Sequence, residues 1–145
     1  MNKENIQYGY TDTSEGQIHF SKMGEGDVSL LLFHESPQSS KVYERVIPYL
    51  AEKFSVYAFD TPGYGMSTPP SSPLKIEEYA KLLVEGINNL KIQEYAVGGC
   101  HTGASLALEV LNTKGTDDAI FCVLNGVPYF SVEERQEYMN NWSPD

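Results

Sequence analysis

The strongest fold signal in the sequence is Tyr95-Ala96-Val97-Gly98-Gly99-Cys100-His101-Thr102-Gly103. Its apolar start predicts a buried strand, and the apolar spacing over 106–111 predicts a helix directly behind it. Gly99 and Gly103 stand two residues before and two residues after His101. Without side chains at these two positions, the helix can begin close to the strand. The stretch therefore predicts a strand–turn–helix unit with His101 at the apex of the turn.

Strands and helices alternate through the rest of the chain. Short apolar runs predict strands at 6–11, 17–22, 28–33, 54–59, 95–97 and 119–124, the first two forming a hairpin around 13–16. Helical spacing predicts helices over 42–50 (kinked by Pro48), 76–90 and 106–111, and Ser131-Val132-Glu133-Glu134 predicts a capping box for a last helix. This alternation predicts right-handed crossovers, hence an α/β fold with a mostly parallel, doubly wound sheet and an N-terminal hairpin.

Reactive side chains follow three of the predicted parallel strands. They lie in His34-Glu35-Ser36-Pro37, in 60–67 and in Gly99–Gly103. Ligands of such sheets bind beyond the carboxyl ends of the strands. These three segments are therefore predicted to form one site.

The composition is that of a globular protein, and the length fits one domain or part of a larger one. The chain has 145 residues, with 10 Lys and Arg against 20 Asp and Glu, a formal net charge of −10. We expect no binding to nucleic acid or to a membrane, because both anionic surfaces need clustered positive charge. No apolar run approaches the ~20 residues of a membrane span, and two cysteines without Cys-x-x-Cys spacing argue against a disulfide framework. A cytoplasmic location is predicted.

Two positions of the turn can carry a nucleophile. With His101 at the centre, both flanking glycines fit the frame Gly-x-nucleophile-x-Gly, called the nucleophile elbow. A shift by one residue would centre Cys100, a thiol nucleophile, but would put the branched Thr102 where a small residue is needed. We therefore take His101 as the elbow residue, and expect Cys100 beneath it as a small buried apolar side chain.

In these motifs and in the order of its predicted elements, the sequence resembles the α/β-hydrolase fold superfamily. The matching motifs are His34-Glu35-Ser36-Pro37, Asp60-Thr61-Pro62-Gly63-Tyr64-Gly65-Met66-Ser67 and Gly99–Gly103, and the match runs from Gln17 to about Phe130. It is most similar to the epoxide-hydrolase and haloalkane-dehalogenase-like branch, within a group that has His-Thr-Gly at the elbow. The resemblance implies an incomplete three-layer sandwich: residues 1–130 as the N-terminal half of the core, and 131–145 as the start of a helix leading to a missing cap domain.

The resemblance also implies roles for single residues. The backbone N–H groups of Ser36 and Thr102 would form an oxyanion hole, and His101 would be the catalytic residue. His34, Glu35 and Cys100 are candidates for the pocket. Asp60 matches a motif that shapes a loop in the family and does not react.

Three departures from the family pattern limit these expectations. Glu35 stands where the family has Gly, His101 replaces the usual nucleophile, and the family's acid and catalytic histidine belong to a C-terminal half that this sequence does not contain. The expected function is a hydrolase of a small organic substrate of the ester, epoxide or carbon–halogen class, inactive or incomplete as this chain. The alternative is a non-catalytic binding or interaction protein; a flavodoxin-like binder is disfavoured because phosphate-cradling glycines are missing.

The sequence leaves the role of His101 open between a general base, a nucleophile, a metal ligand and a ring that only fills the pocket. No cofactor is expected, because neither Gly-x-Gly-x-x-Gly nor a Walker lysine is present. No metal site is expected either, since His34, Glu35, Cys100 and His101 include no pair with ligand spacing on one element. The uncovered sheet edge beyond 119–124 predicts self-association or a partner chain.

Overall fold

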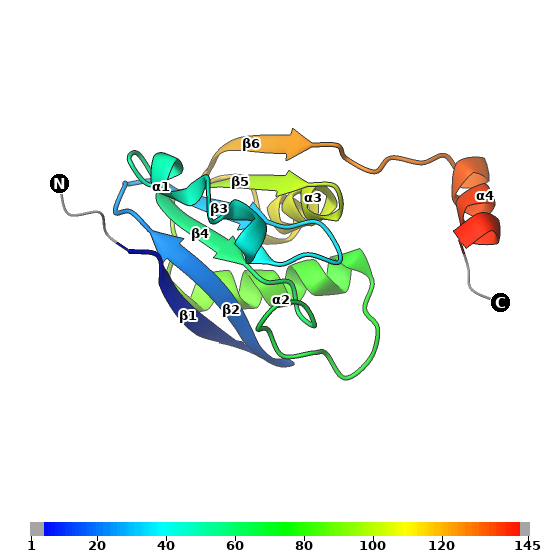
Figure 1. The fold of residues 1–145 in the computed structure, drawn as a ribbon, viewed down its shortest axis with the longest axis horizontal. Helices are drawn as coiled ribbons and strands as arrows, with labels where there is room; N and C mark the ends of the chain where they lie inside the picture. Colours follow the sequence, from blue (N-terminus) through cyan, green and yellow to red (C-terminus); the bar gives the residue numbers. More distant parts are fainter. Residues whose placement is uncertain (1–4, 143–145) are drawn as a thin grey trace.

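Six strands form one sheet in the computed structural model, which describes residues 5–142 (Figure 1). They are β1 (Gln7–Thr13), β2 (Gly16–Met23), β3 (Ser29–Phe33), β4 (Ser55–Phe59), β5 (Tyr95–Cys100) and β6 (Ala119–Asn125). Their order across the sheet is β1-β2-β4-β3-β5-β6. The pairs β1/β2 and β2/β4 are antiparallel, and the pairs β3/β4, β3/β5 and β5/β6 are parallel. The predicted mostly parallel, doubly wound sheet with an N-terminal hairpin is confirmed.

The helices agree with the prediction except between β3 and β4. They are the 3-10 helix η1 (Ser40–Tyr43), α1 (Ile47–Leu50), α2 (Ile76–Asn89), α3 (Thr102–Lys114) and α4 (Val132–Trp142). The single kinked helix expected over 42–50 is wrong, because two short helices occupy this segment. Pro48 lies in the first turn of α1. Its ring provides no N–H for a helix arriving from upstream, but suits the first turn of a new one.

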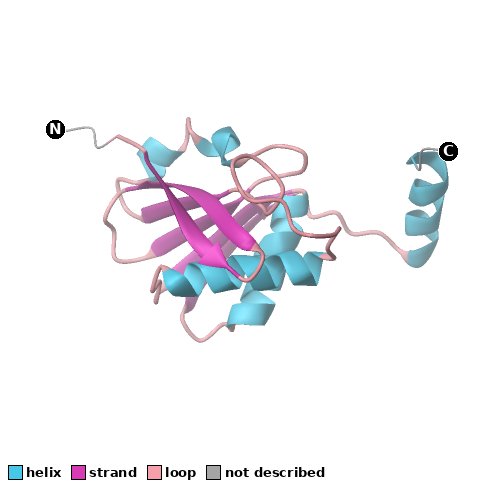
Figure 2. Ribbon diagram, turned by 90° about the horizontal axis from the view of Figure 1, so that it is seen from below, coloured by secondary structure: helices cyan, strands magenta, loops and turns pink. Residues whose placement is uncertain are grey.

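Side chains of the central strands alternate between two apolar layers. Leu31 and Phe33 of β3 face α2 and α3 in the larger core cluster, and Leu30 and Leu32 face Ile47 of α1 in the smaller one. This is the two-residue period of a strand buried on both faces. Figure 2 shows the two long helices on one side of the sheet and the short helices on the other.

The chain leaves the sheet after β6. This edge strand is largely exposed, and α4 stands apart from the sheet at the end of an extended segment (Figure 1). The predicted capping box is confirmed: Ser131 N–H donates to Glu134 Oε2 at 2.7 Å, and Glu134 N–H donates to Ser131 Oγ at 3.2 Å. Across residues 5–142, no helix has the length and apolarity needed to cross a membrane.

The strand order explains where a site can form. After β3 the chain passes to β4 on one side and returns to β5 on the other, so β3 lies between its two successors. Loops that leave neighbouring parallel strands in opposite directions open a crevice at the carboxyl ends of those strands. Here one of these loops is 34–39, which follows β3 in the chain, and the other is the turn from β5 into α3.

Candidate functional site

The turn from β5 into α3 holds His101 in an unusual backbone conformation. His101 has φ 50° and ψ −119°, and its N–H donates to the carbonyl oxygen of Asn125 at 2.9 Å. A Cβ on Gly99 would overlap the Gly103 carbonyl, and a Cβ on Gly103 would overlap the Phe33 carbonyl. The two glycines thus allow the close approach expected for a turn centred on His101, while Cys100 ends β5 in ordinary strand conformation.

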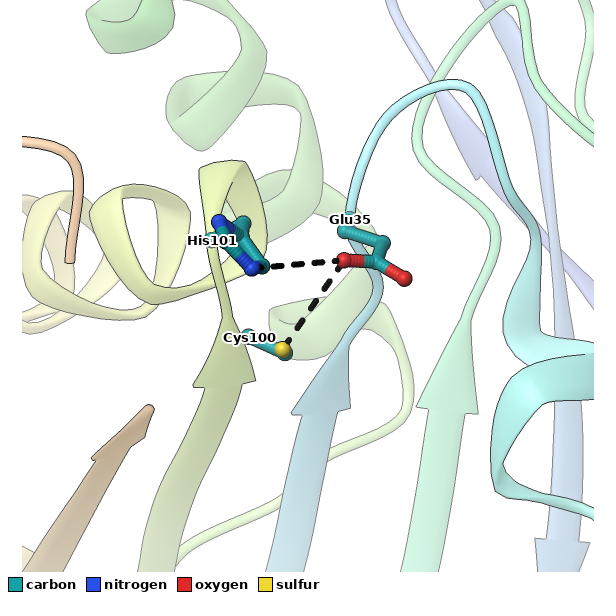
Figure 3. Close-up of side chains that lie close together, drawn as sticks. All are labelled: Glu35, Cys100 and His101. Atoms are coloured by element: carbon teal, nitrogen blue, oxygen red, sulfur yellow. Dashed lines mark hydrogen bonds and ion pairs between the residues drawn. The ribbon is translucent and has the colours of Figure 1, made fainter. Parts of the chain in front are cut away.

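Three side chains from two segments that are distant in sequence meet at this turn (Figure 3). Glu35 comes from the loop after β3, Cys100 from the end of β5, and His101 from the apex. His101 Nε2 lies 3.8 Å from Glu35 Oε2, and Cys100 Sγ lies 3.9 Å from the same oxygen. The side chains of His101 and Glu35 are 63% and 38% exposed, so solvent and small solutes reach the cluster.

Cys100 differs from the expectation in its burial. It is half-buried beside Glu35, and not a fully buried apolar side chain beneath His101. Partial burial raises the pKa of the Cys100 thiol most, and the nearby Glu35 carboxylate raises it further. The thiolate is the reactive form of cysteine. Without a bound cation, Cys100 is thus a weak nucleophile, which favours His101 as the reacting group.

His34 is buried and holds the loop that carries Glu35. Its Nδ1 donates to the Glu35 carbonyl oxygen at 2.8 Å, and its Nε2 accepts the Thr61 N–H at 3.0 Å. Burial lowers the pKa of the His34 ring, which agrees with a neutral imidazole in this pair of bonds. Both nitrogens are engaged, so His34 positions the loop and does not reach the crevice.

The two expected oxyanion-hole residues lie next to each other. Ser36 N–H donates to Thr102 Oγ1 at 2.7 Å, so one expected donor already has an acceptor within the protein. Thr102 is the first residue of α3, and an N–H at that position has no acceptor inside its helix. Thr102 N–H is therefore the better placed of the two donors, and the oxyanion role of the pair stays a prediction.

Asp60 shapes the neighbouring loop, in line with its expected structural role. Its carboxylate accepts N–H groups from Ser40 at 2.6 Å and from Met66 at 2.9 Å, and it pairs with His19 Nδ1 at 2.9 Å. Burial by itself would raise the pKa of Asp60, but these hydrogen bonds outweigh burial and the pKa is lowered. Ser67 Oγ donates to the Asp60 carbonyl oxygen at 2.7 Å and completes the loop.

An apolar cavity of about 280 Å³ lies next to Cys100, on the face of the sheet that the short helices only partly cover. Its lining includes Leu32, Tyr43, Phe54, Val123 and Asn125. It has the size of a small organic group, and Cys100 both lines it and contacts Glu35.

Two residues of the site, Asn125 and Gly126, were not predicted from the sequence. Asn125 accepts the His101 N–H, and the His101 ring packs over Gly126, where a Cβ would lie 3.5 Å from His101 Cε1. Their only signal in the sequence was their place directly after a predicted strand. A strand end predicts proximity to the site, but not which turn it will contact.

Comparison with known proteins agrees with the fold. A family model described as alpha/beta hydrolase fold matches residues 28–124. Haloalkane dehalogenase 2 of Mycobacterium tuberculosis (strain ATCC 25618 / H37Rv) is 32% identical over 100 residues, covering 68% of this chain and 35% of that protein. Pimeloyl–acyl-carrier-protein methyl ester esterase of Legionella pneumophila (strain Corby) is 31% identical over 93 residues, covering 63% and 36%.

Among solved structures, N-acyl homoserine lactonase AidH complexed with N-butanoyl homoserine superposes with a TM-score of 0.80 at 28% identity. The alignment covers 89% of this chain and 48% of that one. The chain thus spans about a third of the length of the curated relatives and about half of this structural neighbour.

Proposed function

Because this chain belongs to the α/β-hydrolase fold family, we propose that its site hydrolyses small carboxylic esters, with His101 as the reacting group. The observation that carries the proposal is the position of this imidazole. It is largely exposed, stands at the strained apex of the turn, and lies directly before the Thr102 N–H at the start of α3. A reactive group beside a fixed hydrogen-bond donor is the arrangement that acyl transfer requires.

Imidazole chemistry favours esters over the two other expected substrate classes. If Nε2 attacks an ester carbonyl, the C–O bond breaks, the acylated ring gives up its Nδ1 proton, and the leaving alkoxide departs as the alcohol. Water then cleaves the acyl-imidazole to the acid and free His101. If the same nitrogen attacks the saturated carbon of an epoxide or alkyl halide, an alkylated imidazole forms that water does not cleave. As a nucleophile, His101 can therefore turn over only acyl substrates. As a general base, it can also activate a water molecule.

The relatives provide independent support for a carbonyl substrate. One curated relative is a methyl ester esterase, and one structural neighbour is an N-acyl homoserine lactonase. Another relative is a haloalkane dehalogenase. We assign the ester class to this chain from the residue at its elbow, because the relatives' names span more than one class.

Hydrolysis of p-nitrophenyl acetate and butyrate by the chelator-treated 145-residue chain tests the proposal. His19 and His34 are both buried, so His101 is the histidine that an ester can reach. We expect a rate per imidazole about 100-fold above that of N-acetylhistidine at the same pH, within the ~10²–10⁴ typical of a positioned acid or base. His101→Gln should abolish this excess. Glu133→Gln, on the exposed face of α4, should leave it unchanged.

Two results would contradict ester hydrolysis at His101. One is a wild-type rate no higher than that of N-acetylhistidine, and the other is full activity in folded His101→Gln protein. The first result would favour the second candidate, a non-catalytic binding protein. That candidate has a specific observation behind it, since Ser36 N–H is bonded to Thr102 Oγ1 and Glu35 places a carboxylate beside the expected oxyanion position.

A further inference from the structure

The Glu35, Cys100 and His101 side chains present three different ligand atoms to one point. A carboxylate oxygen, a thiol sulfur and an imidazole nitrogen all lie within 4.8 Å of one another. This combination of oxygen, sulfur and nitrogen suits a borderline-soft divalent ion, Zn²⁺ above all. From these positions we propose that the three residues form a zinc site with an open coordination position.

The distances agree with tetrahedral coordination. Zn–N and Zn–O bonds of about 2.0–2.2 Å and Zn–S bonds of about 2.3 Å imply ligand separations of roughly 3.4 Å for N···O and 3.6 Å for S···O. The observed separations are 3.8 Å from His101 Nε2 to Glu35 Oε2 and 3.9 Å from Cys100 Sγ to Glu35 Oε2. These two separations exceed the tetrahedral values by a few tenths of an ångström, and the third, between the Cys100 and His101 ligand atoms, lies within 4.8 Å.

The backbone holds the three ligands in place before any ion binds. Phe33 and Gly99 are register partners in the parallel pair β3/β5, so the segments carrying Glu35 and Cys100 leave the sheet side by side. The bonds of His34 fix the loop that carries Glu35, and the Asn125 carbonyl fixes the backbone of His101. A preformed site loses less conformational entropy on binding than three free side chains would.

Charge favours a dication at this point. A carboxylate and a thiolate supply two negative charges, and in the described part of the chain Glu35 has no ion pair with lysine or arginine. Three protein ligands leave one tetrahedral position for water or a solute, the pattern of zinc sites that are not purely structural. The ligands come from different elements, which is why spacing along one element gave no signal.

The zinc site goes beyond the proposed esterase, although it uses the same imidazole. Nε2 cannot hold an ion and attack an ester at the same time. Zinc should therefore suppress the imidazole-dependent reaction of the metal-free protein. Cobalt binding is measured without substrate, so the two proposals fail separately: cobalt binding without ester hydrolysis removes only the esterase, and ester hydrolysis without cobalt binding removes only the zinc site.

Cobalt titration of the reduced, chelator-treated chain tests the site. We expect one Co²⁺ per chain, tetrahedral visible bands, and a near-ultraviolet band from thiolate-to-cobalt charge transfer that added Zn²⁺ removes. Cys100→Ser should abolish the charge-transfer band. Cys122→Ser is the matched control, because Cys122 is exposed on β6 and outside the cluster, and it should bind like wild type.

The two other ligands are tested by Glu35→Gln and His101→Gln, with circular dichroism to confirm folding. Loss of an outer-shell partner already costs about 10–100-fold in metal affinity, so loss of a direct ligand should cost at least as much. The proposal is overturned if wild type binds no stoichiometric cobalt. It is equally overturned if the charge-transfer band survives in Cys100→Ser, or if folded Glu35→Gln and His101→Gln proteins bind as tightly as wild type.

Discussion

At the scale of single residues, His101 combines backbone strain with chemical exposure. Its φ of 50° and ψ of −119° lie outside the regions that ordinary residues populate, and such strain costs about 1–3 kcal/mol. The side chain gains little from packing in return, because it is largely exposed. Packing of the His101 side chain therefore does not offset the strain energy, which is the usual situation at a functional position.

Replacing His101 separates this strain from the chemistry of the ring. His101→Gly relieves the positive φ and adds about 0.5–1 kcal/mol of backbone entropy cost, whereas His101→Ala removes the ring and keeps the strain. We expect His101→Gly to exceed His101→Ala in free energy of unfolding by about 1 kcal/mol, measured by urea denaturation. Equal stabilities would mean that the turn relaxes at no cost.

Some features of single residues were predictable from the sequence, and others were not. His101 was predictable as the apex, because Gly99 and Gly103 mark where side chains cannot fit. The bond between Ser36 N–H and Thr102 Oγ1 was not predictable. It depends on a side-chain rotamer and on the separation of two segments 66 residues apart, and neither leaves a local pattern.

At the scale of elements, the contact between α3 and β3 fixes the site. Gly103, in the first turn of α3, lies against the Phe33 carbonyl at the end of β3. This contact sets the distance from the apex of the turn to the loop that carries Glu35. The order of strands and helices was predictable from the apolar periodicity and from the glycine frame. The division into η1 and α1 was not, because the apolar spacing over this segment fits one helix, whereas Pro48 lies in the first turn of a new one.

Adding one methyl group at this contact tests its role. In Gly103→Ala the new Cβ overlaps backbone, which cannot move aside, so we expect a loss of about 1–3 kcal/mol or more in the free energy of unfolding. The matched control is Gly98→Ala, where the Cβ would lie 3.0 Å from the flexible end of Leu32. That variant should lose less than about 1 kcal/mol. Equal losses in urea denaturation would contradict a specific helix–strand contact.

At the scale of the whole molecule, the sheet ends in an uncovered apolar edge. β6 pairs with β5 on one side, and its exposed apolar side chains include Ile120, Phe121, Val123 and Leu124. Open edge strands and contiguous apolar patches pair with other chains. Self-association thus stays a prediction, as does the assignment of 131–145 to the approach to a cap.

Concentration-dependent light scattering of the 145-residue chain tests the prediction of self-association. We expect a mass above that of one chain, and Val123→Lys should shift it toward the monomer, because a lysine on an edge opposes pairing. Val123 is 58% exposed, so its replacement spares the core. Met66→Lys, at an exposed apolar residue on a loop, should leave the mass unchanged. A monomer at all concentrations would contradict the prediction.

Local chemistry in the sequence determined the class of fold, the order of its elements and the apex at His101. Each of these follows from apolar periodicity, from turn residues or from glycines, all within a short stretch of the sequence. Only the tertiary structure decided that Glu35, Cys100 and His101 present their ligand atoms to one another, and that His34 bonds to the loop that carries Glu35. These are distances between elements, set by strand order and by the close contact at Gly103, and no local interaction encodes them.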